Sequence, residues 1–387
     1  MKILVLGCGM IGSVIAKDLA GSIEPSKLVV SDKDLERAKT VASSIKDATW
    51  IALDSTDYSN LVKMMERFDL IVGALPGDFG FKALKAAIES RVSMVDVSYT
   101  PEDPLELDGE AKEAGVCIIP DCGVAPGLSN MLVGHAASKL DRVQKVHIMV
   151  GGIPAYPVEP LGYSVTWSVE GLIDEYMRGA RIVDKGRITE VPALSGLEEV
   201  DFPGIGRLEA FYTDGLRTLL HTISHVETMW EKTLRYPGHV QKVELLKALG
   251  FFGEDPVMVE GLEVSPRKVT AKILEKSLRK PELGDLLAMS VEVIGEKRCE
   301  GVCLRYHLLD RHDEAKKVTA MARTTAYTAS VTAKKLAQGA IKQKGVIPPE
   351  ILAMDKTLFQ DIQSELKTRG VNVVEAENPI QTKDYQY

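Results

Sequence analysis

The sequence predicts an α/β protein with a Rossmann-type doubly wound parallel sheet and a second α+β domain with a mostly antiparallel sheet. Two observations support this prediction. Over residues 1–127, short apolar strands alternate with helical segments, which is typical of a parallel sheet covered by helices on both faces. From residue 128 onward, the strands become longer and alternate apolar with polar residues, as expected for antiparallel strands.

The individual elements follow from these patterns. The first six predicted strands lie within residues 2–6, 26–34, 49–57, 69–76, 93–99 and 116–121. Five longer strands are predicted within residues 141–154, 202–215, 225–238, 286–296 and 300–311, with helices at 166–179 and 238–252. The Ala/Thr-rich segment 317–339 predicts a helix that returns to the first domain, because small residues permit close packing. We therefore predict a discontinuous dinucleotide-binding domain (1–127 with 318–387) and a substrate-binding and oligomerisation domain (128–317).

Composition narrows the class of protein. The 387 residues carry a net charge of −8 with acidic and basic residues interspersed, which argues against nucleic acid or a membrane as partner. No apolar run reaches the roughly 18 residues that span a bilayer, and the apolar N-terminus is too short for a signal peptide. Five cysteines without framework spacing fit a reducing, cytoplasmic location. Cys299 and Cys303 are interpreted as structural, and no metal site is predicted.

A glycine-rich turn predicts the cofactor site. In "GCGMIG", Gly7, Gly9 and Gly12 directly follow the first strand and open a helix, which is the context a dinucleotide fingerprint needs. Asp32 ends the second strand, where a carboxylate accepts from ribose hydroxyls and repels a 2′-phosphate. This favours NAD, while Lys33 keeps NADP as a minority alternative. The predicted cofactor-binding residues are Gly7, Cys8, Gly9, Met10, Ile11, Gly12, Asp32, Asp54, Ala74, Leu75 and Pro76.

Two parts of the predicted cofactor site lie outside the glycine-rich turn, at Asp54 and at residues 74–76. Asp54 either reaches the adenine side of the cofactor or caps the following helix. Ala74, Leu75 and Pro76 end the fourth strand, at the edge where ligands of such sheets bind. We expect them to lie along the pyrophosphate and the nicotinamide ribose.

Several blocks together resemble the saccharopine dehydrogenase family. They are "PDCGVAPGLSN" (120–130), "GGIPAYPVEPLGYSVTWSVEGLIDEY" (151–176), "LEAFYTDGLRTLL" (208–220) and "KTLRYPGH" (232–239). The chain looks closest to the lysine 6-dehydrogenase branch, since Ala125 stands where saccharopine-forming members carry an acid. That resemblance implies NAD-dependent oxidation of L-lysine at its ε-carbon, giving ammonia, NADH and 2-aminoadipate semialdehyde, which cyclises to piperideine-6-carboxylate. A saccharopine or other opine-type dehydrogenase and a non-catalytic dinucleotide-binding regulator are the alternatives.

Amine oxidation needs a base, because only the neutral amine releases hydride. Asp121, at the end of the sixth strand, and His239, whose imidazole titrates near neutral pH, are the predicted catalytic residues. A turn-stabilising role for Asp121 and a local hydrogen bond for His239 are the structural alternatives. The predicted substrate-binding residues are Asp96, Tyr99, Arg217, Trp167 and Arg235. Arg217 is preferred over Arg235 for the substrate α-carboxylate, and a surface or inter-strand salt bridge is the alternative for each arginine. Core packing is the alternative for Trp167. Finally, an open sheet must protect its edges, so we expect a homodimer or higher homo-oligomer.

Overall fold

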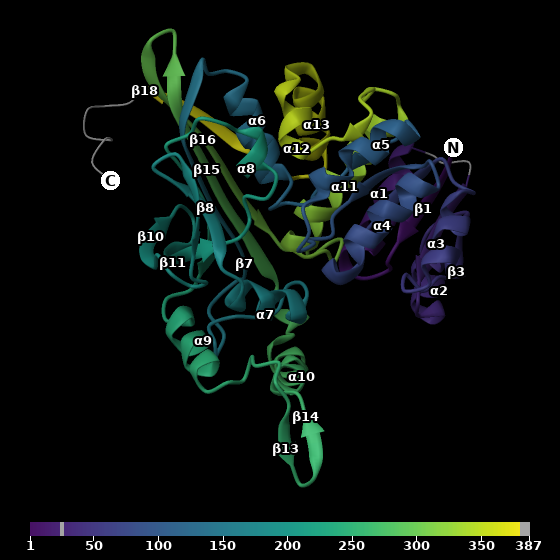
Figure 1. The fold of residues 1–387 in the computed structure, drawn as a ribbon, viewed down its shortest axis with the longest axis horizontal. Coiled ribbons are helices and arrows are strands. Elements are labelled where there is room, and N and C mark those ends of the chain that lie inside the picture. The colour runs from purple at the N-terminus through teal and green to yellow at the C-terminus, as the bar shows by residue number, and fades with distance from the viewer. Residues whose placement is uncertain (24–26, 380–387) are drawn as a thin grey trace.

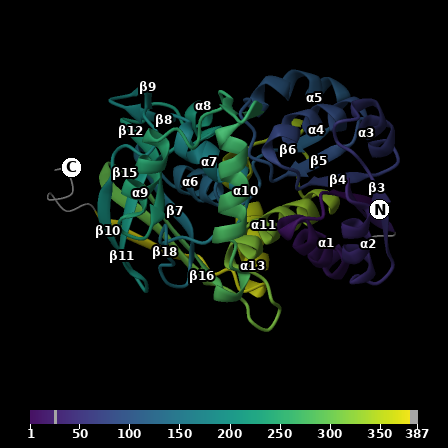
Figure 2. The ribbon, with the colours of Figure 1, turned by 90° about the horizontal axis from the view of Figure 1, so that it is seen from below.

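A computed structural model describes residues 1–23 and 27–379. Two sheets lie on either side of a long helix, α11 (Ala320–Ala337), as Figures 1 and 2 show. The first sheet and its helices contain the N-terminal part of the chain, and the second sheet contains most of the middle part. The predicted fold class is therefore confirmed.

The first sheet is parallel throughout and runs in the order β17-β6-β5-β4-β1-β2-β3. The chain order reverses between β1 and β4, which is the topological switch point of a Rossmann sheet. Its strands are β1 (Lys2–Leu6), β2 (Lys27–Asp32), β3 (Ala48–Ala52), β4 (Leu70–Gly73), β5 (Ser93–Asp96), β6 (Cys117–Ile119) and β17 (Gly345–Val346). Sequence patterns did not predict β17, because two residues are too few to show a strand period.

Helices cover both faces of this sheet because alternate residues of each strand point to opposite sides. Ile3 and Val5 of β1 pack in the core beneath α1 and α11, whereas Leu4 and Leu6 pack beneath α3 and α4. The helices are α1 (Met10–Ile23), α2 (Leu35–Ser43), α3 (Tyr58–Met65), α4 (Gly77–Glu89), a 3₁₀ turn η1 (Pro104–Leu107) and α5 (Asp108–Ala114). Because apolar clusters cover both faces of the sheet, its central strands are apolar at successive positions.

The second sheet is antiparallel except for the parallel pair β12 and β7. Its main path is β10-β11-β12-β7-β15-β16-β18, and β8 and β9 attach beside β12. The strands are β7 (Arg142–Pro154), β8 (Ala180–Asp184), β9 (Arg187–Val191), β10 (Glu198–Phe202), β11 (Gly206–Thr213), β12 (Thr228–Arg235), β15 (Asp285–Lys297), β16 (Glu300–Arg311) and β18 (Val374–Pro379). Among the described strands, β10 and β18 stand at the two ends of this path. The predicted homo-oligomer stays a prediction.

The C-terminal segment serves both parts of the molecule. Helix α11 packs against α1 beside the first sheet and against β15 of the second sheet. Its small residues had predicted the return to the first domain. Next come α12 (Pro349–Met354), which packs on α6 (Leu128–Ala137), and α13 (Lys356–Thr368). The last described strand, β18, pairs with β16 of the second sheet, although it falls in the range predicted for the dinucleotide-binding domain. Residues 380–387 of that range lie outside the described residues, and the domain division itself stays a prediction.

The remaining elements flank the second sheet. They are α7 (Val169–Met177), α8 (Leu219–Thr222), α9 (His239–Ala248), α10 (Pro266–Leu278), a 3₁₀ turn η2 (Pro281–Leu283) and the hairpin β13 (Val257–Val259) with β14 (Leu262–Val264), which projects from the body in Figure 1. Within residues 1–23 and 27–379, no helix has both the length and the apolar character that a bilayer crossing requires.

Candidate active site

The turn after β1 has the geometry of a dinucleotide-binding turn. Gly7 has a φ of +92°, and a Cβ there would come within 2.4 Å of the Ala74 carbonyl oxygen, so only glycine fits between β1 and β4. A Cβ on Gly12 would lie 1.9 Å from the Gly7 carbonyl oxygen, whereas nothing approaches a Cβ on Gly9 within 4 Å. Gly9 therefore leaves open space in front of the free N–H groups that begin α1, which fits a pyrophosphate.

Asp32 is held at this turn. Its carboxylate accepts from the backbone N–H of Cys8 at 2.9 Å and from that of Asp34 at 2.9 Å. Arg37, which sequence analysis did not single out, places its guanidinium 3.9 Å from the same carboxylate. A carboxylate here suits ribose hydroxyls, and a nearby arginine can receive a 2′-phosphate. The site thus has one feature that favours NAD and one that accommodates NADP.

The other predicted cofactor residues lie around this turn. Ala74, Leu75 and Pro76 connect β4 to α4 beside Gly7. The Cys8 thiol is buried, and burial raises its pKa to about 12, so it is an inert packing group. Met10 begins α1 with an exposed side chain, and Ile11 packs against the core.

Asp54 does not cap a helix. Its carboxylate accepts from the backbone N–H and the hydroxyl of Thr56, and those hydrogen bonds lower its pKa. Asp57 caps α3 instead, through the N–H of Asn60. The capping alternative is therefore wrong for Asp54. Its contact with the adenine side stays a prediction.

A buried ion pair joins the first sheet to the second part of the chain. The guanidinium of Arg217, in the loop between β11 and α8, donates to the carboxylate of Asp121 at 3.1 Å, and both side chains are almost fully buried. Burial raises the pKa of Asp121, and the charge of Arg217 opposes that rise. Asp121 and Arg217 both have left-handed backbone angles, with φ values of +51° and +53°. Such angles are uncommon for residues other than glycine and cluster at functional sites.

Two more predicted residues surround this pair. The centre of the Tyr99 ring lies 4.8 Å from the Arg217 guanidinium, and the Tyr99 hydroxyl donates to the Asp214 carbonyl at 2.6 Å. Asp96, at the end of β5, accepts from the hydroxyl and N–H of Ser98. Burial raises the pKa of Asp96 to about 7. Asp96, Tyr99 and Asp121 therefore lie together at the carboxyl ends of β5 and β6, and Arg217 joins them as the partner of Asp121. Their roles in substrate binding and catalysis stay predictions.

The other predicted residues form a separate group in the second part. Arg235 pairs with Glu175 at 2.9 Å and lies over the Tyr163 ring. His239 is hydrogen-bonded through both ring nitrogens, to the Tyr176 hydroxyl at 2.8 Å and to the Leu161 carbonyl at 2.9 Å. Burial lowers the pKa of His239 to about 3. This geometry does not support proton transfer by His239, because the ring is buried and both of its nitrogens are already hydrogen-bonded within the protein.

Trp167 packs against an apolar cluster that includes Tyr163 and Tyr176. Its ring lies so close to Gly171 that a Cβ on that residue would collide with it. Its carbonyl accepts from Arg279. The core-packing alternative is the better supported for Trp167. Among the described residues, no group of three or more His, Cys, Asp or Glu side chains is arranged to hold a metal.

Sequence analysis missed Glu231. This residue lies on β12, on the same face as Thr233 and Arg235, because alternate residues of a strand point to the same side. All three are buried. The signal was present in the sequence: "EKTLR" puts charged residues on both faces of a strand that lies inside the sheet.

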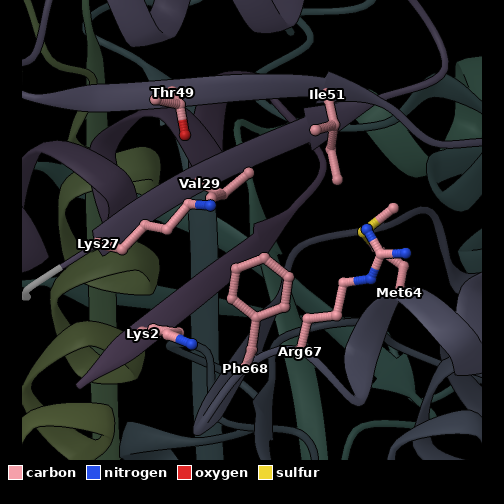
Figure 3. A pocket seen from close by; sticks show the side chains of 8 residues that line it. All are labelled: Lys2, Lys27, Val29, Thr49, Ile51, Met64, Arg67 and Phe68. Carbon is pink, nitrogen blue, oxygen red and sulfur yellow. The ribbon is translucent and has the colours of Figure 1, made fainter.

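A hollow beside the first sheet lies away from the glycine-rich turn and from the buried ion pairs. It is lined by Lys2, Lys27, Val29, Thr49, Ile51, Met64, Arg67 and Phe68, as Figure 3 shows. Lys2 and Lys27 begin β1 and β2, whereas the glycine-rich turn follows the opposite end of β1. This hollow is therefore not the cofactor crevice.

Comparison with known proteins supports this description. Residues 3–119 match the family model of the saccharopine dehydrogenase NADP binding domain, and residues 123–371 match that of the saccharopine dehydrogenase C-terminal domain. Saccharopine dehydrogenase (NADP+, L-glutamate-forming) of Pyricularia oryzae is 27% identical over 291 residues. That match covers 71% of this chain and 63% of the enzyme, so this chain matches less than two thirds of that relative.

Two further similarities extend over nearly the whole chain. Carboxyaminopropylagmatine dehydrogenase of Synechocystis is 22% identical over 92% of this chain and 94% of its own length. A solved structure of apo saccharopine dehydrogenase (L-Glu forming) from Saccharomyces cerevisiae superposes with a TM-score of 0.78 at 19% identity, over 97% of this chain and 99% of that one. At this identity the superposition supports the fold alone. Both halves of the chain match the two models of one family, and the chain belongs to the saccharopine dehydrogenase family.

Proposed function

We propose that this protein oxidises L-lysine at its ε-carbon with NAD, releasing ammonia and forming 2-aminoadipate semialdehyde, which cyclises to piperideine-6-carboxylate. The observation that carries the proposal is the pair of buried carboxylates, Asp96 and Asp121, at the carboxyl ends of β5 and β6. These strand ends lie on the same edge of the sheet as the glycine-rich turn, which is where ligands of such sheets bind.

The chemistry requires proton acceptors at that edge. A lysine ammonium has an ordinary pKa of about 10.4 and must lose a proton before its carbon can release hydride. Bound NAD would accept that hydride. Asp96, whose pKa is raised to about 7 by burial, is suited to accept a proton near neutral pH. Asp121, already paired with Arg217, is suited to orient the ammonium group.

The substrate assignment depends on what the crevice lacks. Ala125 stands in the turn where the resemblance places an acid in saccharopine-forming enzymes. An acid with an ordinary pKa in this turn would add full negative charge to the crevice, keep a bound amine protonated and oppose simple oxidation. The alanine therefore favours oxidation of a primary amine.

A second candidate is an opine-type dehydrogenase, which joins or separates an amine and a keto acid. The curated relatives favour it, because they include NADP-linked saccharopine dehydrogenases and carboxyaminopropylagmatine dehydrogenase. Arg37 beside Asp32 also accommodates NADP. A non-catalytic regulator that only binds the dinucleotide is the third alternative.

A substrate screen at the NADH and NADPH absorbance separates these candidates. The purified protein is given L-lysine or saccharopine with either oxidised cofactor, and ammonia is measured in parallel. The proposal predicts NADH and ammonia in equal amounts from L-lysine without 2-oxoglutarate. Reduced cofactor from saccharopine but not from lysine would favour the second candidate, and no turnover with any amine would favour the regulator.

A further inference from the structure

Glu231 lies beside the loop that carries Arg217. A Cβ on Gly215 would fall 1.6 Å from Glu231 Oε1, so the carboxylate lies directly against the backbone of this loop. Two residues further on, Arg217 pairs with Asp121 at the carboxyl end of β6. Glu231 thus lies next to the candidate substrate site, on the face of β12 that also carries Thr233 and Arg235.

Three neighbouring carboxylates have arginine partners. Asp121 pairs with Arg217 at 3.1 Å, Asp214 with Arg181 at 2.9 Å, and Glu175 with Arg235 at 2.9 Å. In each pair a hydrogen-bonded arginine offsets part of the cost of burying the carboxylate.

Glu231 differs from these acids. It is 4% exposed, makes no ion pair within residues 1–23 and 27–379, and its Oε2 is buried without a hydrogen-bond partner in the same ranges. Asp96 and Glu350 also lack a cationic partner there, but each accepts a hydrogen bond from a hydroxyl, of Ser98 and of Thr222 respectively. Glu350 shares with Glu231 an Oε2 that is buried without a partner, but it lies on α12 rather than beside the Arg217 loop's Gly215. A buried carboxylate with an unused oxygen is costly unless a ligand completes it.

A hydrogen-bond donor on the same face of β12, the Nε–H of Arg235, also lacks a partner among the described residues. Arg235 gives two of its nitrogens to Glu175 and to a backbone carbonyl, but its Nε is buried without a hydrogen-bond partner among the described residues. One strand face therefore offers one unused carboxylate oxygen and one unused guanidinium N–H. These are complementary to an ammonium group and a carboxylate group.

We infer that Glu231 binds an amino group of the substrate and that the site selects a cationic diamino monocarboxylic acid over a dicarboxylic one. This inference rests on the proposed function in so far as the substrate is an amino acid. An ammonium group brings three N–H donors and the positive charge that Glu231 lacks. The unused Nε–H of Arg235 can serve only one substrate carboxylate. A second carboxylate would meet Glu231 without a further arginine to compensate it, because Arg181 and Arg217 are already paired.

Calorimetric titration of the NADH-saturated protein tests the inference without turnover. The probes are L-lysine, L-2-aminohexanoic acid, which lacks only the side-chain amine, L-2,4-diaminobutyric acid, L-ornithine and L-2-aminoadipic acid. Native protein should bind L-lysine more tightly than L-2-aminoadipic acid. Glu231→Gln, which keeps the shape but cannot ionise when an ammonium group binds, should weaken L-lysine binding on the order of 10- to 100-fold. The same variant should bind L-2-aminohexanoic acid with an affinity within about twofold of that of the native protein, or with a loss clearly smaller than the loss for L-lysine.

Glu198→Gln is the matched control. Glu198 lies on β10 and pairs with Lys232, whose side chain is on the face of β12 opposite to Glu231. Glu198→Gln should therefore leave the affinity for every probe unaltered. Thermal melting of each variant checks folding. Burial raises the pKa of Glu231 to about 8, so its side chain is largely uncharged near neutral pH, and Glu231→Gln should not lower the melting temperature there.

The outcomes are separable from those of the proposed function. Binding of any of the cationic amino acids with the predicted loss in Glu231→Gln supports the inference even if lysine is not oxidised, in which case only the proposed function fails. Equal losses for L-lysine and L-2-aminohexanoic acid, tighter binding of L-2-aminoadipic acid by native protein, or no binding of any cationic amino acid would overturn it.

Discussion

The glycine-rich turn of the first sheet and the polar face of β12 in the second sheet are built in opposite ways. At the turn, backbone atoms define the site: a Cβ on Gly7 or Gly12 would lie only 2.4 Å or 1.9 Å from a carbonyl oxygen, so neither position accepts a side chain. On β12, buried charged side chains define it: Arg235 pairs with Glu175 of α7, and Glu231 lies against Gly215 of the loop that carries Arg217. A backbone site is specified by local sequence, whereas a side-chain site depends on residues brought together from distant segments.

The largest expected effect comes from breaking the Asp121–Arg217 pair. Asp121→Asn should lower the free energy of unfolding by about 3–5 kcal/mol, because it leaves a buried arginine without its counterion. Urea denaturation measures the change. The double variant Asp121→Leu/Arg217→Met should recover much of the loss, since it removes both charges together. If Asp121→Asn is as stable as native protein, the pair does not hold the two parts together.

The turn offers a comparison within one helix. Gly12→Ala should abolish tight NADH binding, since its Cβ would collide with the Gly7 carbonyl. Gly21→Ala in the same helix has nothing within 4 Å of its Cβ. That change should preserve binding and raise stability by about 0.5–1 kcal/mol, because alanine favours the helix. Fluorescence titration with NADH and thermal melting distinguish the two, and normal NADH affinity in Gly12→Ala would contradict the close-packed turn.

His239 tests the assignment within the second sheet. His239→Gln should lower the free energy of unfolding by about 1–3 kcal/mol, through hydrogen bonds lost to Tyr176 and Leu161. The pKa of His239 is lowered from 6.5 to about 3, so its contribution to stability is present above about pH 6.5 and is lost as the pH falls towards 3. Stability of the variant should therefore fall less steeply between these values. A loss of turnover of about 10²- to 10⁴-fold in a fully folded variant would restore the predicted acid–base role.

The smallest expected effect concerns cofactor choice at the turn. Asp32→Ala should weaken NAD binding by roughly tenfold and reduce the difference between the NAD and NADP affinities. The variant loses the acceptors for the ribose hydroxyls and the charge that repels a 2′-phosphate. Arg37→Ala is the partner variant and should weaken NADP more than NAD, since Arg37 is the guanidinium beside Asp32. Dissociation constants for both cofactors decide the matter. Tighter NADP than NAD binding by native protein would overturn the NAD assignment.

Much of the first sheet was predictable from local patterns. Its six longer strands, the turn at Gly7 and the acid at Asp32 follow from apolar runs and glycine spacing, which act over a few residues. Strand β17 was not predictable, because its two residues pair with β6 only after the chain has returned from the second sheet. The same holds for β18, whose partner β16 is far away in sequence.

The sequence by itself determined the class of fold, the position of the dinucleotide turn and the family, because each depends on local periodicity, on glycine geometry or on ordered motifs. Only the tertiary structure decided which charged residues act together. It paired Asp121 with Arg217 across 96 residues, enclosed His239 between Tyr176 and Leu161, and left Glu231 without a partner among the described residues. The physical reason is that the partner and the burial of a charge are set by how the two sheets and their loops pack, and no local pattern in the chain encodes that packing.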